Sequence, residues 1–426
     1  MTSVSLRSLL RATSLAALLT AAIASAQPPL PGTNLASLLD YARAHNPELA
    51  AMRLEADAAA QRVQPAGALP DPVLRVELEN VNNYGNGGGV NLLPSKVGET
   101  KYTLMQQLPA WGKRELRSAA AAADAWQAQA RSIATWSEQA MRIRTAFAQY
   151  YLASRSERIT RELLDLVVRL EQVAQARYAG GLAPQQDVIR SQLEQTAMRA
   201  ELIALAGEKR QQQARINGLL GRDPAAPLAE PEALPPLPAT GTFAAPELIA
   251  RARSASPTVQ AERARLQAAQ ANRELTLRNR YPDFNIGISP SQMGSRITTW
   301  GVMVEVNIPL QQSTRRSQER EAVAMVDAAQ ARAEAAAVQA AAGLQEQVAA
   351  LHAARESETL IATRQLPQSE LGLQSAVAAY ESGKVDFATL LEAQRLTRKA
   401  RLDLLKFQTE AQARAAEIER TLGESL

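Results

Sequence analysis

The chain has 426 residues, with 47 Lys and Arg against 43 Asp and Glu, and no cysteine. The charges nearly balance and the arginines are scattered among glutamates, which argues against a nucleic-acid groove. The lack of cysteine excludes disulfides, thiolate metal sites and a lipidated N-terminal cysteine, and an aromatic content of 4% is poor material for several globular cores, so long helices are favoured.

The first segment has the pattern of a secretory signal peptide. Arg7 and Arg11 precede an uncharged run that ends in Ala-Ser-Ala at residues 24–26. A basic start, a short apolar stretch and an A-x-A site are typical of export, so residues 1–26 are predicted to be a signal peptide cleaved after Ala26. No other apolar run approaches the length of a membrane-spanning helix, so any membrane crossing must be made by strands.

After this segment the sequence repeats itself at an offset of roughly 200 residues. Four landmarks recur in order: a helix broken at an Asn-Pro or Ser-Pro step, a Pro-Asp pair, a proline followed by a basic pair, and a Tyr-x-x-Gly turn. They lie at 46–47 and 256–257, at 70–71 and 282–283, at 109–114 and 309–316, and at 178–181 and 380–383. We therefore expect two structural repeats, at 27–221 and 247–426, joined by a proline-rich linker at 222–246.

Within each repeat, one stretch changes from helical to alternating periodicity. The two stretches are 71–108 and 283–308, and each is predicted to form a strand pair with one apolar face, as in Val302, Val304 and Val306. Strands of about ten residues with this pattern are typical of membrane barrels, although a soluble sheet would alternate similarly. Four strands cannot close a barrel in lipid, so we expect several chains to share one.

Long helices follow each strand pair. No proline or glycine interrupts residues 113–178, which predicts one helix of about 100 Å. The second copy is expected to be interrupted only at Gly343, Pro367 and Gly372. A glycine turn and a returning helix complete helical hairpins at 113–221 and 313–423, and 3-4 spacing on the second returning helix predicts a coiled-coil seam of Leu390, Ala393, Ala400, Leu404, Phe407 and Ala411.

The sequence offers no catalytic constellation. His45 and His352 are the only histidines and are far apart, so a metal site is not predicted. No phosphate-binding loop, Ser/His/Asp set or isolated carboxylate pair stands out from the helical charges. We expect a protein that is not an enzyme and uses no cofactor.

The doubled order of helix, strand pair, long helix and Tyr-x-x-Gly turn resembles the TolC-like outer-membrane factors, also called outer membrane efflux proteins. The resemblance covers nearly all of the chain after the signal peptide, and it is strongest at 178–192 and 380–394. It implies a mainly α fold with membrane β-strands: a homotrimer closing a twelve-stranded barrel in outer-membrane lipid, with an α-helical duct reaching into the periplasm of a diderm bacterium. Residues 108–117 are similar to the heavy-metal efflux branch of this family.

The resemblance also implies partners and sites. The helical tips of the family meet a periplasmic adaptor protein and an inner-membrane transporter, here expected to be of the RND type. The candidate adaptor-docking residues are Tyr178, Gly180, Gly181, Leu182, Tyr380, Ser382, Gly383, Lys384 and Val385.

Family members close the tip with acidic residues on the returning helix. The matching positions here are Asp187 and Arg190 in the first repeat and Thr389 and Glu392 in the second, so the acidic set is incomplete and these four residues are the candidate periplasmic gate. The alternative is that Asp187 and Glu392 are solvated and pair with Arg190 and Arg395.

Three functions fit these observations. The first is the passive exit duct of a tripartite efflux pump for metal cations or small toxic compounds. The second is the outer-membrane channel of a type I protein secretion system. The third, of another class, is a periplasmic coiled-coil scaffold, which predicts a protein that is soluble without detergent.

Overall fold

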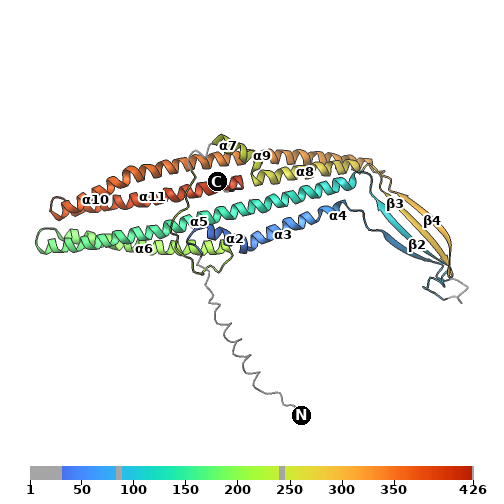
Figure 1. Cartoon of the computed structure of the whole chain (residues 1–426), viewed down its shortest axis with the longest axis horizontal. Coiled ribbons are helices and arrows are strands. Elements are labelled where there is room, and N and C mark those ends of the chain that lie inside the picture. The colour runs from blue at the N-terminus through green and yellow to red at the C-terminus, as the bar shows by residue number, and fades with distance from the viewer. Residues whose placement is uncertain (1–30, 83–88, 239–244, 425–426) are drawn as a thin grey trace, which may run out of the picture.

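A computed structural model describes residues 31–82, 89–238 and 245–424. The expected signal peptide and its cleavage site at Ala26 lie outside these residues. The molecule is elongated, with a bundle of long helices and a curved sheet at one end (Figure 1). The predicted mainly helical fold with two repeats is confirmed.

The N-terminal helices run toward the sheet. They are α2 (Leu35–His45), α3 (Pro47–Gln61) and α4 (Val63–Gly67). Asn46 separates the first two because its side-chain oxygen accepts the N–H groups of Glu48 and Leu49 at 2.8 and 3.2 Å, and proline occupies the first position of α3. In the second repeat, α7 (Ala245–Ala255) and α8 (Pro257–Arg278) are separated at Ser256, and proline again occupies the first position of the second helix. The Ser256 hydroxyl does not cap α8 but pairs with the Thr258 hydroxyl at 3.0 Å.

The sheet has four antiparallel strands in the order β1 (Val73–Glu79), β2 (Glu99–Leu108), β3 (Phe284–Met293) and β4 (Arg296–Val306). The register aligns Leu74, Leu104, Ile288 and Val302 across all four strands. Their side chains belong to a continuous apolar face that is exposed, and Val302 is 79% exposed. The expected alternation therefore holds, but the apolar face has no covering layer in the part of the chain that the structure describes.

A buried ion pair joins the sheet to the helices. Lys113, at the start of α5, lies 2.8 Å from Asp283, just before β3, and the same carboxylate accepts the Ala110 N–H at 2.8 Å. Burial opposes ionisation of Asp283, but these two hydrogen bonds outweigh it and lower its pKa. These contacts therefore join the two repeats at the junction between the strands and the helices.

The long helices form two hairpins. The first consists of α5 (Lys113–Ala179) and α6 (Gln185–Leu220), and α5 runs without interruption for 67 residues, one residue beyond the predicted end at 178. The second consists of α9 (Gln312–Leu360), a π turn (Ile361–Gln365), α10 (Leu366–Glu381) and α11 (Phe387–Leu422). No helix in the described residues is long and apolar enough to cross a membrane.

The expected interruptions of the second long helix are only partly correct. Gly343 and Gly372 lie within α9 and α10 and break neither, because packing against neighbouring helices outweighs a cost of about 1 kcal/mol per glycine. Pro367 does change the helix. Proline lacks an N–H and its ring crowds the preceding turn, and the N–H of Leu366 bonds to Ile361, five residues back.

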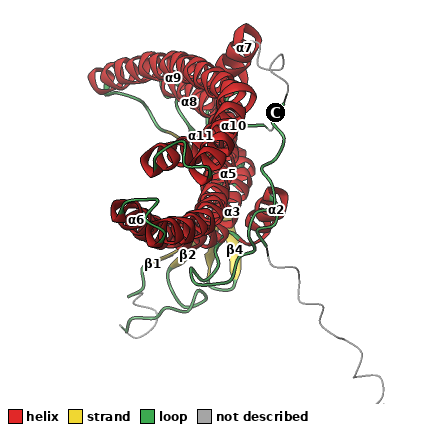
Figure 2. Ribbon diagram, turned by 90° about the vertical axis from the view of Figure 1, so that its left-hand side faces the viewer, coloured by secondary structure: helices red, strands yellow, loops and turns green. Residues whose placement is uncertain are grey.

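Viewed along the long axis, the helices form an arc (Figure 2). Near the tips its order is α6, α5, α11 and α10, and near the sheet it is α3, α5, α8 and α9. The predicted seam on α11 is partly correct: Leu390, Ala400 and Ala411 are buried, but Leu405 is buried in place of Leu404. The shift follows from α11 packing against both α5 and α9, which spreads its buried positions over two faces.

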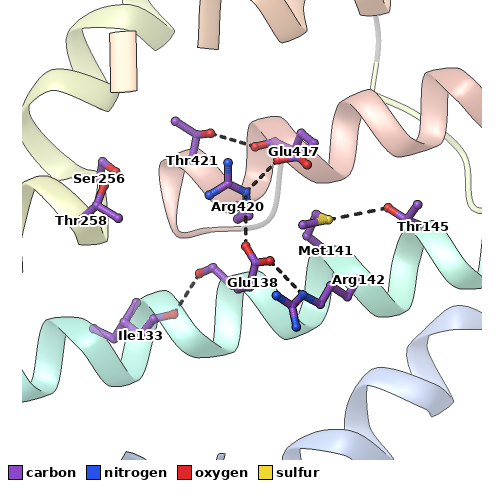
Figure 3. Close-up of polar contacts among 11 residues, drawn as sticks. Ile133, Glu138, Met141, Arg142, Thr145, Ser256, Thr258, Glu417, Arg420 and Thr421 are labelled. Carbon is purple, nitrogen blue, oxygen red and sulfur yellow. Dashed lines mark hydrogen bonds and ion pairs between the residues drawn. The ribbon is translucent and has the colours of Figure 1, made fainter. Parts of the chain in front are cut away.

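Polar contacts join the C-terminal end of α11 to α5. Arg420 lies 2.7 Å from Glu417 on its own helix and 3.6 Å from Glu138 on α5, and Glu138 also accepts a hydrogen bond from Arg142 at 2.9 Å (Figure 3).

The described part of the linker, residues 222–238, contains no helix or strand and lies along the helices. Its backbone carbonyls accept side-chain hydrogen bonds, including one from Arg355 to Pro238 at 2.8 Å.

Candidate functional site

Both helical hairpins end in turns of the same geometry, at the end of the molecule opposite the sheet (Figure 1). Gly181 and Gly383 have φ values of 70° and 74°, which a residue with a Cβ adopts only under strain. In each turn a backbone N–H reaches back to the last helical turn, from Leu182 to Arg177 and from Lys384 to Ala379, both at 2.8 Å. The repeated Tyr-x-x-Gly motif therefore encodes a helix stop and reversal.

The two tip tyrosines have different environments. Tyr178 is 48% exposed, whereas Tyr380 is 1% exposed. The Tyr380 ring packs edge-on against Phe387 with a centroid distance of 5.3 Å, and it lies in a buried cluster with Leu170 and Ala174 of the other hairpin. One copy of the motif thus holds the two hairpins together, and the other faces outward.

Arg177 joins the two turns. Its guanidinium lies 5.0 Å from the centre of the Tyr380 ring and donates hydrogen bonds to the carbonyls of Tyr380 and Glu381. These carbonyls belong to the last turn of α10, where the helix dipole favours a cation. A substituent on Gly383 would lie 3.1 Å from this guanidinium, so the turn approaches Arg177 closely.

The remaining candidate docking residues lie at the surface. Leu182 is a large exposed apolar side chain, and Val385 is half-buried. The other members, Gly180, Gly181, Ser382, Gly383 and Lys384, are all exposed. Tyr380 is the only candidate docking residue that lies within the core.

Of the candidate gate residues, Asp187 is the one that the structure buries. Burial is the main reason that its pKa is raised above the usual 3.8, and the negative charge of Asp386 adds to this while Arg190 and Arg177 oppose it. Asp187 lies close to the Tyr380 hydroxyl, whose pKa is raised by burial and by this carboxylate, although the hydroxyl has no hydrogen-bond partner of good geometry in the described residues.

The second pair of gate candidates is more exposed. The side chain and backbone N–H of Thr389 both donate to Asp386, at 2.5 and 2.9 Å, and these bonds cap the start of α11 and lower the pKa of Asp386. Glu392 is exposed on the same helix. The alternative interpretation is partly correct. Glu392 is exposed and Arg190 interacts electrostatically with Asp187, but Asp187 is buried and the Arg395 guanidinium bonds to Glu194 at 2.6 Å.

A set of ion pairs above the turns was not anticipated from the sequence. Arg395 and Arg398 of α11 reach Glu194 and Glu201 of α6, at 2.6 and 2.8 Å, and Arg401 reaches Glu370 of α10 at 2.7 Å. The three arginines are spaced every three residues and so follow one side of α11. This spacing was the available signal, but the sequence alone does not tell which helix supplies the acids.

The two repeats also differ in the hydrogen bonds made by a pair of equivalent glutamines. Glu171 of α5 accepts hydrogen bonds from Gln192, Gln195 and Gln175, which lower its pKa. The position equivalent to Gln192 is Gln394, and the position equivalent to Glu171 is Leu373. Gln394 is 0% exposed, and neither atom of its amide has a partner in the described part of the chain.

The described residues contain no group of three or more His, Asp or Glu side chains that could hold a metal ion. His45 stacks on Tyr41 at a centroid distance of 4.2 Å, which accounts for one histidine as a helix-surface residue. The arrangement at the tips therefore offers exposed apolar and charged side chains around two rigid turns.

Comparison with known proteins gives one family and one fold. The family model described as outer membrane efflux protein matches residues 38–222 and 248–424. A relative, the cobalt-zinc-cadmium resistance protein CzcC of Cupriavidus metallidurans, is 25% identical over 391 residues, which are 91% of this chain and 90% of the relative.

Solved structures share the fold. The outer-membrane channel OprN superposes with a TM-score of 0.78 and 20% identity, covering 92% of this chain and 90% of its own. The outer membrane protein VceC of Vibrio cholerae superposes with a TM-score of 0.77 and 19% identity, covering 92% of this chain and 96% of its own.

Proposed function

The chain belongs to the outer membrane efflux protein family, and from this premise we propose that it is the exit duct of a tripartite pump. In this role it passively conducts metal cations or small toxic compounds from an adaptor and pump to the exterior. Family membership is consistent with the expected absence of enzymatic activity and with an outer-membrane location, and it favours the channel over the periplasmic scaffold.

One observation carries the proposal: the sheet is incomplete in a way that further copies of the chain complete. In the described residues, β1 and β4 each have one unpaired edge, and one face of the sheet is apolar and exposed. Lipid cannot hydrogen-bond to free strand edges, so a membrane sheet of this kind must close on itself. Three copies joined from β1 to β4 would give the expected twelve-stranded barrel.

The helical layer supports the same assembly. The α6 edge of the arc exposes Ile189, Leu193 and Ile203, and the edge formed by α9 and α10 exposes Leu360 and Leu371. These edges lie at opposite ends of the arc (Figure 2), so each could cover the other in a neighbouring subunit. A homotrimer joined head to tail buries both apolar edges.

We assign adaptor docking to the two tip turns, with Tyr178, Leu182 and Lys384 as its exposed contacts and Tyr380 as their buried support. Asp187, Arg190, Thr389 and Glu392 form the gate. The inner-membrane partner is a transporter of the RND type. The support is that tips with exposed apolar and charged groups lie at the end of the molecule farthest from the sheet.

Metal cations are favoured as cargo by the similarity to CzcC, whose name records resistance to cobalt, zinc and cadmium. The gate carries exposed Glu392, and threefold symmetry would bring three such carboxylates toward one passage, which favours cations.

The test is a deletion strain of the source bacterium, complemented with the wild-type gene or with a Leu182→Glu variant. We expect the deletion to lower the tolerated concentrations of cobalt, zinc and cadmium, the wild-type gene to restore them, and Leu182→Glu to restore them only in part at equal protein level. Unchanged metal tolerance with loss of a secreted protein from the medium would instead establish the secretion channel.

A further inference from the structure

The junction between strands and helices carries exposed aromatic rings that the proposed duct does not use. Trp111 lies between β2 and α5 and is 94% exposed, and Tyr281 lies between α8 and β3 and is also exposed. The strands β2 and β3 are the inner strands of the sheet, and α5 and α8 are inner helices of the layer. A neighbouring subunit joined at the outer edges would therefore leave both rings uncovered.

The rings border the apolar face of the sheet. Phe284 and Val306 form the helix-side end of that face, and exposed Ile308 and Leu310 continue it to the start of α9. Tryptophan and tyrosine are enriched where a membrane meets water, because one part of the ring is apolar and another forms hydrogen bonds. Their place at this border fits the boundary of a bilayer.

The same level of the molecule is strongly basic. Residues 109–118, 273–283 and 311–320 together contain nine basic and four acidic side chains. Three of the acids are paired within the junction: Asp283 with Lys113, Glu319 with Arg280, and Glu274 with Arg273. An excess of positive charge therefore remains where the apolar surface ends.

Arg278 connects this charge to the rings. Its guanidinium carbon lies 5.9 Å from the centre of the Tyr281 ring and 3.6 Å from where a Cβ of Gly112 would lie, next to Trp111. Arg278, Arg117 and Arg316 are all exposed. Arginine binds phosphate with two parallel hydrogen bonds and keeps its charge at any relevant pH.

We propose that this junction is a lipid-binding collar, formed by Trp111, Tyr281, Arg117, Arg278 and Arg316, that docks phospholipid headgroups of the leaflet facing the helices. The rings lie at headgroup depth and the arginines bind the phosphates. This proposal rests on the proposed function, because it requires the strands to be inserted in a membrane. It adds a specific surface that fixes the depth of insertion.

The first experiment uses tryptophan fluorescence. The chain has four tryptophans, Trp111, Trp126, Trp136 and Trp300, so full-length variants that retain one of them can be made by changing the other three to phenylalanine. Each variant is reconstituted into phosphatidylcholine vesicles that contain lipid brominated near the headgroup end of the acyl chains. Bromine quenches an indole that touches the lipid.

We expect the emission of Trp111 and Trp300 to fall strongly and that of Trp126 to stay unchanged. Trp126 is a matched control, because it is 67% exposed but lies 15 residues along α5, about 22 Å away. Trp300 lies on the apolar strand face and reports insertion itself. Quenching of Trp300 without Trp111 overturns the collar and leaves the duct intact, whereas no quenching of Trp300 overturns the duct.

The second experiment tests the charges. Wild-type protein from vesicles of equal phosphatidylcholine and phosphatidylglycerol should retain phosphatidylglycerol in several-fold excess after detergent extraction, and Arg278→Gln with Arg316→Gln should reduce this excess to near parity. The control pair Arg131→Gln and Arg169→Gln, on exposed positions of α5, should keep the wild-type excess. Equal retention in all three proteins contradicts phosphate binding at the collar.

Discussion

The tip tyrosines occupy equivalent positions in the sequence but have different roles in packing. Tyr380 is enclosed by Phe387, the apolar residues of α5 and the guanidinium of Arg177, whereas Tyr178 stays at the surface. The Tyr-x-x-Gly motif alone predicts the turn and not this difference. The difference depends on which hairpin lies over the other, and that is a property of the tertiary arrangement.

Substitutions at the two tyrosines should therefore have unequal effects. We expect Tyr380→Ala to destabilise the tip by about 3 kcal/mol or more, because it leaves a cavity in a buried cluster, and Tyr178→Ala to change stability by less than about 0.5 kcal/mol. Tyr380→Phe should be nearly neutral, since within residues 31–82, 89–238 and 245–424 the hydroxyl has no well-formed hydrogen bond. Midpoints of thermal unfolding measured by circular dichroism test the order, and equal losses at both positions would refute it.

The two aspartates at the tips should respond to pH with opposite signs. The pKa of Asp187 is raised above its unfolded value, so its contribution favours the fold below pH 3.8 and is lost as pH rises through the folded pKa. The pKa of Asp386 is lowered, so its contribution is present above pH 3.8 and is lost as pH falls through the folded pKa.

At pH 7 we therefore expect Asp187→Asn to raise the unfolding midpoint and Asp386→Asn to lower it. Both differences from wild type should shrink as the pH falls below the usual aspartate value. Measurements of the three proteins between pH 3 and pH 7 test this, and a lower midpoint for Asp187→Asn at pH 7 would show that the ionised carboxylate is stabilising.

At the scale of elements, the sequence predicts the helices and strands whose hydrophobic periodicity is regular. Helix length, the two hairpins, the strand pairs and their apolar face follow from periodicity sustained over many residues. The π turn before Pro367 and the burial of Leu405 in place of Leu404 could not be predicted, because both depend on how one helix meets several neighbours. The ion pairs made by the arginines of α11 could not be predicted for the same reason, because each glutamate partner lies on another helix.

One buried residue between the two hairpins is expected to reduce the stability of the fold. Gln394 of α11 buries an amide that has no hydrogen-bond partner among the described residues, and leaving such a group unsatisfied costs about 1–3 kcal/mol. We expect Gln394→Leu to raise the unfolding midpoint.

The equivalent substitution in the first repeat, Gln192→Leu, serves as the matched control. It should lower the midpoint, because Glu171 loses a hydrogen bond at 2.9 Å. Destabilisation by both substitutions would mean that Gln394 has a partner in the assembled protein.

At the scale of the whole molecule, a single chain leaves apolar surfaces and strand edges that further copies could cover. In the part of the chain that the structure describes, the sheet has two unpaired edge strands and an uncovered apolar face. The helices form an arc (Figure 2), and both of its ends expose apolar residues. These features could be predicted as patterns, and four strands could be judged too few for a barrel. The curvature that brings the open edges into position for neighbouring copies comes from the fold.

The two faces of the sheet should tolerate charge differently. Val302→Arg places a charge on the exposed apolar face, and we expect it to destabilise the inserted state by about 2–4 kcal/mol and to reduce the amount in the outer membrane. Thr299→Arg, three residues earlier on the opposite face of β4, should have little effect. Quantification of both variants in fractionated membranes tests this, and equal losses would argue against a lipid-facing sheet.

The most direct test of the shared barrel is a disulfide between subunits. The chain has no native cysteine, so one can be introduced at Glu77 on β1 and a second at Thr299, Met303 or Glu305 on β4. Within one chain these strands are separated by β2 and β3, a distance of about 14 Å, which no disulfide can span. We expect at least one pair to give a covalent trimer on a non-reducing gel of oxidised membranes, whereas monomers at every position, or a ladder that stops at dimers, would contradict the trimeric outer-membrane channel.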